Sequence, residues 1–182
     1  MKCNCLVCLL IAVILLAPAP ARAEEKDVSD MEHRERIFVG GMIGLQLGTL
    51  TAVSINLHGG YRLTNRLSAG IGGMYQYAND RWFGESYSSH VYGGSVFARF
   101  GLAGDLFLHA EYERLQVESR LSLQPPDERP RITEQNYLLG AGYGLRLSES
   151  AVINLMLLYN FNDDSQVHFS NPFMRVGIDI YF

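Results

Sequence analysis

Cysteine is missing from most of this chain, because Cys3, Cys5 and Cys8 are its three cysteines. All three lie before or inside an apolar stretch, Leu6 to Leu16, that has the character of a cleaved signal peptide. Their Cys-x-Cys-x-x-Cys spacing therefore predicts neither a disulfide framework nor a zinc site. We expect a protein that has no metal site and no cofactor.

The same apolar stretch is too short to cross a bilayer as a helix, which needs about 20 apolar residues. Lys2 precedes it and Ala21-Arg22-Ala23 follows it, so residues 1–23 are predicted to be a Sec-type signal peptide. Residues 24–35 are polar and have no periodic apolar face, which predicts a solvated periplasmic tail. The remaining residues, 36–182, are predicted to form one domain.

Basic residues are not in excess either. The chain has 15 lysines and arginines against 19 aspartates and glutamates, a net charge of −4. The charges are spread along the chain, and no basic groove accompanies the aromatic residues. We therefore do not expect the protein to bind nucleic acid.

The final segment, Phe173 to Phe182, shows the pattern that organises the rest of the chain. Side chains of a strand alternate between two faces. One face of this segment is wholly apolar and the other contains two charged residues, Arg175 and Asp179. An apolar face opposite a charged face is typical of a strand between lipid and a polar lumen.

Seven further segments repeat this alternation of apolar and polar faces. Turn-forming residues separate all eight segments, so the pattern predicts an all-β, eight-stranded, antiparallel, up-and-down transmembrane β-barrel. The eight segments run approximately over 37–48, 53–63, 67–77, 92–100, 106–113, 136–147, 153–161 and 173–182.

The seven connections are of two kinds. Those after the second, fourth and sixth segments are short turns, around 64–66, 102–105 and 148–150. Of the four others, the first, Thr49 to Thr51, is also short, whereas Asn79 to Ser89, Glu118 to Arg131 and Asn162 to Pro172 are predicted to be long loops. Short periplasmic turns and longer external loops are typical of membrane barrels. A soluble eight-stranded barrel would bury its apolar face inside and would not require this asymmetry.

The lumen of an eight-stranded barrel is only wide enough for side chains. An unpaired guanidinium there is costly, so we expect Asp179 and Glu111 to pair with a layer of arginines near the periplasmic end, formed by Arg62, Arg99 and Arg146. These charges are interpreted as lumen filling, with a narrow channel for small solutes as the alternative. The predicted polar network comprises Arg62, Arg99, Arg146, Arg175, Glu111, Glu113 and Asp179.

Aromatic residues near the strand ends are predicted to lie at the two headgroup levels. Trp82 and Phe83, in the predicted second external loop, are the candidates for contact with an extracellular partner or with lipopolysaccharide. The predicted aromatic girdles comprise Tyr61, Tyr75, Tyr77, Tyr92, Phe100, Tyr137, Tyr159, Phe161 and Phe182.

From Arg36 to Phe182 the chain resembles the small outer-membrane β-barrels of Gram-negative bacteria, the OmpA transmembrane-domain and OmpX-like group. The resemblance rests on the eight alternating segments, the loop asymmetry and the aromatic terminus. It implies that Ile178, Ile180 and Phe182 form the signal read by the barrel-assembly machinery. It also implies an outer-membrane, porin-like architecture, but not one activity, since such barrels serve as anchors, adhesins, channels and enzymes.

One motif supports an enzymatic alternative. His168-Phe169-Ser170-Asn171 is similar to the His-x-Ser-Asn motif of the outer-membrane lipid A deacylases. That resemblance implies a hydrolase using His168 and Ser170, but the acidic third member is missing. The only acid further downstream, Asp179, lies on the opposite face of its strand.

The sequence as a whole favours a non-enzymatic protein of the cell surface with a closed polar lumen and exposed loops. Its expected partners are outer-membrane lipid and lipopolysaccharide, the assembly machinery during insertion, and an extracellular partner at the loops. We expect a monomer.

Overall fold

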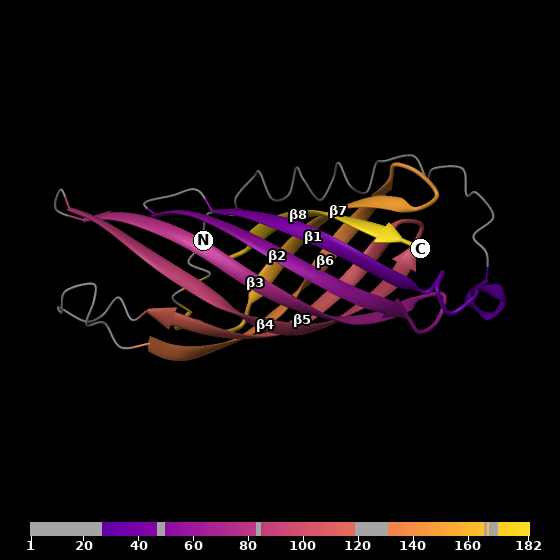
Figure 1. Cartoon of the computed structure of the whole chain (residues 1–182), viewed down its shortest axis with the longest axis horizontal. Helices are drawn as coiled ribbons and strands as arrows, with labels where there is room; N and C mark the ends of the chain where they lie inside the picture. The colour runs from indigo at the N-terminus through magenta and orange to yellow at the C-terminus, as the bar shows by residue number, and fades with distance from the viewer. Residues whose placement is uncertain (1–26, 47–49, 83–84, 119–130, 166, 168–170) are drawn as a thin grey trace, which may run out of the picture.

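The computed structural model describes residues 27–46, 50–82, 85–118, 131–165, 167 and 171–182, and we confine the account to them. Eight strands form one closed antiparallel sheet, which confirms the predicted fold class (Figure 1). The strands are β1 (Ile37–Gln46), β2 (Leu50–Arg62), β3 (Leu67–Trp82), β4 (Glu85–Ala103), β5 (Leu106–Glu118), β6 (Arg131–Arg146), β7 (Ala151–Asn160) and β8 (Phe173–Tyr181).

Each strand pairs with its neighbours in sequence, and β8 closes the barrel against β1. In that closure Phe38 pairs with Tyr181 and Gly44 pairs with Arg175. Backbone groups of both edge strands are thereby hydrogen-bonded, so the sheet has no open edge. The start of β1 and the end of β8 lie at the same end of the barrel, together with the turns that join β2 to β3, β4 to β5 and β6 to β7 (Figure 1).

Burial alternates along the strands with the predicted parity. In β7, Asn154, Met156 and Leu158 are buried inside the barrel, whereas Leu155 and Leu157 are 38% and 40% exposed on its outside. The same inversion, with polar side chains inside and large apolar ones outside, holds around the barrel. A water-soluble protein would expose the polar face instead, so this is the exterior of a membrane-spanning barrel.

The prediction of a long loop from Asn79 to Ser89 was wrong. β3 continues to Trp82 and β4 begins at Glu85, and their pairing extends through Asn79 with Ser88 to Trp82 with Glu85. This hairpin projects beyond the other strands (Figure 1). Backbone hydrogen bonds between two strands form whether the side chains on the strand faces are apolar or polar. The hydrogen-bond ladder between β3 and β4 therefore continues beyond the residues that show apolar alternation.

The other long connections follow the prediction more closely. Residues 119–130, which contain the three prolines of that segment, lie outside the described residues. The connection from Asn162 to Pro172 separates β7 from β8 as expected. We call the end of the barrel with the β2–β3, β4–β5 and β6–β7 turns the turn end, and the opposite end the loop end. The connections at the turn end are short, as predicted. Gly104 turns the chain between β4 and β5 with φ 58°, a conformation that favours glycine.

The segment before β1 packs on the barrel where a solvated tail was expected. It contains a one-turn 3-10 helix, Val28–Asp30, in which the Val28 side chain is buried and its N–H donates to Asn65 Oδ1 at 2.7 Å. Ser29 donates its N–H to Asp27, which lowers the pKa of that carboxyl. Burial of Val28 against the β2–β3 turn explains why this segment docks. In the described part of the chain no helix has the length and apolarity to cross a membrane.

Candidate functional site

Arg175 is the centre of the largest charged cluster in the lumen. Its Nη1 donates to Glu111 Oε2 at 2.7 Å and its Nη2 donates to Glu113 Oε1 at 2.6 Å. His109 Nε2 donates to the same Glu111 oxygen at 3.1 Å. All four side chains are buried. One guanidinium thus bridges β8 to two carboxylates of β5 across the barrel, an arrangement that leaves little room for a continuous pore.

Asp179 is the centre of a second charged cluster, nearer the turn end. Its two oxygens accept hydrogen bonds from His58 Nε2, at 2.7 Å, and from Arg99 Nη1. The guanidinium of Arg99 also lies 5.0 Å from the ring centroid of Phe97 and 5.7 Å from that of Phe38. Arg99 is therefore held by one carboxylate and by aromatic faces, which attract cations. Its pairing with Asp179 agrees with the expectation from sequence.

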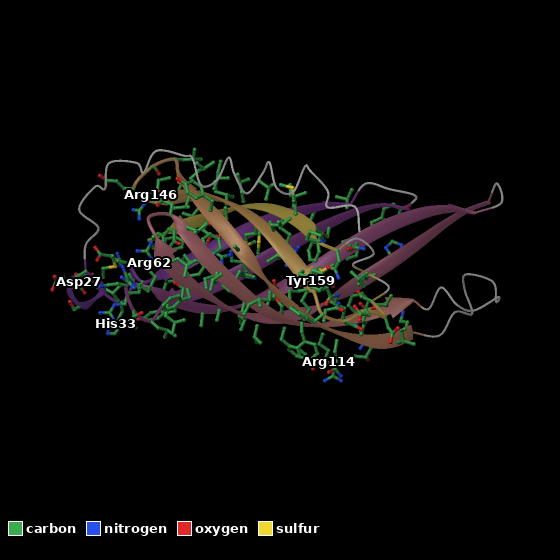
Figure 2. The ribbon with its side chains drawn as sticks, turned by 180° about the vertical axis from the view of Figure 1, so that it is seen from behind. Asp27, His33, Arg62, Arg114, Arg146 and Tyr159 are labelled. Carbon is green, nitrogen blue, oxygen red and sulfur yellow. The ribbon has the colours of Figure 1, made fainter. Side chains whose placement is uncertain are left out.

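The structure does not place the other two arginines of the predicted layer inside the lumen. Arg146 has a side chain that is 47% exposed and lies 3.5 Å from Asp105. Arg62 lies with its guanidinium carbon 4.2 Å from the ring centroid of Tyr181, at the mouth of the barrel. Both are the last residues of their strands and lie at the turn end (Figure 2). Glu111 accordingly pairs with Arg175 and not with this layer.

Apolar side chains fill the parts of the lumen that the charged clusters do not. One cluster, which we call the outer apolar layer, lies towards the loop end and consists of Met74, Val91, Leu115, Val117 and Val167. Val167 comes from the β7–β8 connection and is fully buried, so this connection contributes a side chain to the plug. A second apolar cluster consists of Met42, Leu138, Met156 and Leu158.

Asparagines hold the β7–β8 connection against the barrel. Asn160 Nδ2 donates to Asn136 Oδ1 at 3.0 Å, and Asn171 Nδ2 donates to the Asn160 carbonyl oxygen at 2.7 Å. Ser165 Oγ donates to Glu134, which is buried at the same end. Because these bonds flank Val167, they fix the connection that completes the outer apolar layer.

Several buried lumen nitrogens have no hydrogen-bond partner among the described residues. They belong to amide, imidazole and guanidinium groups, and a buried donor needs a partner such as ordered water. These nitrogens are His58 Nδ1, Asn56 Nδ2, Gln76 Nε2, Arg99 Nε, His109 Nδ1, Asn136 Nδ2 and Asn154 Nδ2.

The residues assigned to the assembly signal point away from the lumen. Ile178, Ile180 and Phe182 are exposed on the outer face, as the parity of β8 requires. Tyr75, Tyr77, Tyr92, Phe100, Tyr137, Tyr159, Phe161 and Phe182 of the predicted girdles are exposed, and Tyr61 is half-buried. Phe83 and the side chain of Trp82 lie outside the described part of the structure.

The predicted catalytic pair, His168 and Ser170, also lies outside the described residues. Asp179 is fully buried in the lumen, and both of its oxygens are bound by lumen side chains. Asp179 therefore cannot act as the acidic member of a catalytic triad on the outer surface. Among the described ranges, no group of three or more histidine, cysteine, aspartate or glutamate side chains could hold a metal ion.

Sequence reasoning predicted the pairing of Arg99 with Asp179, but it missed that Arg175 is the partner of Glu111 and Glu113. The two histidines, His58 and His109, each donate to a carboxylate, and Phe38 and Phe97 surround Arg99. The available signal was parity, because Phe97 and Arg99 occupy the same face of β4. Parity places Phe97 inside the lumen but does not show that its ring packs against Arg99.

Neither a family model nor a curated protein sequence matches this chain. Solved structures to which it is similar include the N-terminal β-barrel domain of Pseudomonas aeruginosa OprF, with 15% identity, a TM-score of 0.47, and coverage of 81% of this chain and 98% of that one. Neisserial surface protein A has 16% identity, a TM-score of 0.48, and coverage of 80% and 96%.

The Yersinia pestis outer membrane protein Ail, in a phospholipid bilayer nanodisc, has 16% identity, a TM-score of 0.46, and coverage of 80% and 99%. At these identities and TM-scores the likeness carries no argument about activity. The interpretation of the molecule therefore depends on its strand pairing, its burial pattern and its lumen.

Proposed function

We propose that this protein is an outer-membrane barrel of a Gram-negative bacterium that acts as a membrane-anchored surface scaffold with a closed lumen. The observation that carries the proposal is the plugged interior, in which Arg175 bridges Glu111 and Glu113 below the outer apolar layer. In this proposal the loop end faces outwards and the short turns face the periplasm. The lumen residues stabilise the barrel and do not conduct.

The exterior supports the membrane part of the proposal. Large apolar side chains such as Leu57 of β2 and Ile71 of β3 are 67% and 69% exposed on the outer face. In water such a continuous apolar belt would drive aggregation, whereas in a bilayer it faces hydrocarbon. Hydrocarbon offers no hydrogen-bond partners to backbone N–H and C=O groups, and closure of the sheet pairs these groups with one another. Export by a signal peptide and insertion by the assembly machinery belong to this proposal.

The scaffold and channel functions differ in one measurable property, the ionic conductance of the folded protein in a planar lipid bilayer. The expected result is no conductance above that of the bilayer alone, because the lumen is filled by paired charges and apolar side chains. The matched variant is Arg99→Ala, which removes one of the two partners of Asp179 and leaves His58. Stepwise conductance of the wild type that Arg99→Ala alters would favour the narrow channel and overturn the scaffold proposal.

A further inference from the structure

A group of polar side chains lies on the outer face of β5 and β6, where apolar side chains are otherwise expected. Arg114 pairs with Gln135, and Gln116 pairs with Thr133, so the four form a two-by-two block on neighbouring strands. Gln116 Nε2 donates to Thr133 Oγ1 at 2.9 Å. We call Arg114, Gln116, Thr133 and Gln135 the polar block. Figure 2 shows Arg114 pointing away from the barrel.

Arg131 adds a second cation beside the polar block. Its Nη1 donates to the Tyr92 hydroxyl at 3.0 Å, and its guanidinium carbon lies 5.7 Å from the centroid of that ring. Tyr92 is paired with Gln116 on β5. The Arg131 side chain therefore reaches from β6 across β5 to β4, above the polar block. This contact orders a guanidinium that would otherwise sample many rotamers.

Below the polar block lies a pair of tyrosines. Tyr112 pairs with Tyr137, and their ring centroids are 5.3 Å apart on the outer face. Tyrosines on the outer face of a membrane barrel, near the ends of its apolar belt, lie at the level of the lipid headgroups. Charged groups facing lipid are costly at the midplane but cost little at this level. The height of Arg114 is thus that of the lipid headgroups.

The surface beside Arg114 has room for a ligand. Gly94 pairs with Arg114 on one side and with Gly73 on the other, so two adjacent outward positions carry no side chain. Packing does not require these glycines, because an added Cβ would approach no atom closer than 3.5 Å at Gly94 and 3.8 Å at Gly73. Between Arg114 and the tyrosines Tyr75 and Tyr92, these two glycines leave the backbone without a covering side chain.

From this geometry we propose that the outer surface of β4–β6 binds the phosphorylated sugar headgroup of lipid A in the outer leaflet. Guanidinium groups bind phosphate oxygens strongly. In this site Arg114 and Arg131 contact phosphate, while Gln116, Thr133 and Gln135 hydrogen-bond sugar hydroxyls. Glu113 and Glu134 are buried in the lumen and do not repel the phosphates. Glu118, the register partner of Arg131, is the acidic residue of β5 with outward parity, so Arg114 is the cation farther from an acidic neighbour on this face. The inference rests on the proposed function, since it requires the loop end to face outwards.

The test uses the folded full barrel in nonionic detergent micelles. Its affinity is measured for bisphosphorylated lipid A, for the same lipid with both phosphates removed, and for phosphatidylglycerol. We expect the wild type to bind phosphorylated lipid A at least about ten-fold more tightly than the other two lipids. The double variant Arg114→Gln/Arg131→Gln should lose about ten-fold in affinity, the equivalent of about 1.4 kcal/mol.

The matched control is Arg66→Gln/Arg146→Gln, which removes the same charge from exposed arginines at the turn end. It should change the affinity by less than about two-fold, since it leaves the polar block intact. Equal losses in both double variants would show general charge attraction and overturn the inference. Equal binding of dephosphorylated lipid A, or of phosphatidylglycerol, would overturn it as well.

Failure of this inference can be told apart from failure of the proposed function. Heat-modifiability on a gel reports whether each variant is folded, independently of lipid binding. A folded, non-conducting barrel without preference for phosphorylated lipid A would overturn the inference alone. A conducting wild type would overturn the scaffold proposal whatever the lipid affinities are.

Discussion

Replacement of Arg175 by methionine is expected to lower the free energy of unfolding of the barrel by about 3–5 kcal/mol. Methionine fills part of the same volume but leaves the carboxylates of Glu111 and Glu113 buried without the guanidinium that bridges them. An uncompensated buried charge costs far more than the pair contributes. Urea unfolding of the refolded barrel in phospholipid vesicles, followed by far-UV circular dichroism, measures the change.

Two comparisons separate this charge effect from simple loss of packing. Combining Arg175→Met with Glu111→Gln and Glu113→Gln removes all three charges, and we expect most of the lost stability to return. Arg146→Met breaks an exposed pair with Asp105 and should cost about 1 kcal/mol or less. The account of the lumen would be wrong if Arg175→Met and Arg146→Met had equal effects.

Gly140→Ala is expected to lower the free energy of unfolding by about 3 kcal/mol or more, or to prevent folding. A Cβ at this position would overlap the carbonyl oxygen of Leu157 on the neighbouring strand and also crowd Leu158. The obstacle is backbone, so it cannot be relieved by a change of rotamer. Relief would require β6 and β7 to separate, which would weaken their hydrogen-bond ladder. The measurement is the same urea titration, preceded by heat-modifiability on a gel.

The matched control is Gly73→Ala, another glycine-to-alanine change in the middle of a strand. Its Cβ would point outwards and approach no atom closer than 3.8 Å. We expect a change of about 1 kcal/mol or less, and in the stabilising direction, because alanine restricts the unfolded chain. Comparable losses at Gly140 and Gly73 would contradict the assignment of inward and outward faces.

The sequence alone was enough to predict the barrel, because a period-two alternation determines which face of each strand is apolar. The register of that alternation is confirmed in all eight strands, from Val39 in β1 to Ile180 in β8. The short turns were predictable for a related reason. Polar turn-forming residues interrupt the alternation there, as at Thr64-Asn65-Arg66.

The outer part of the β3–β4 hairpin could not be predicted in this way. Beyond the membrane both faces of a strand are in water, so alternation no longer indicates where the strand ends. Hydrogen bonding between the strands nevertheless continues to Trp82 and Glu85. A membrane barrel strand is therefore longer than its apolar pattern wherever the hairpin projects into solvent.

The pairing inside the lumen was predictable only in part. Parity indicates that Arg99, Arg175 and Asp179 face inwards, but parity carries no information about partners across the barrel. Those depend on stagger between strands, which places Arg175 opposite β5. Residues at strand ends were assigned to the lumen by the same parity, yet Arg146 lies where the barrel opens to solvent.

The most direct test of the central claim is a nitroxide scan of β7 in phospholipid vesicles. Cys3, Cys5 and Cys8 are first replaced by serine, after which single cysteines are introduced and labelled one at a time from position 153 to position 160. We predict that labels at Leu155, Leu157 and Tyr159 collide with oxygen dissolved in the bilayer. Labels at Asn154, Met156 and Leu158 should be shielded from oxygen and from a water-soluble nickel reagent. Accessibility without this period of two, or with the even positions facing lipid, would contradict the membrane-spanning barrel with a filled lumen.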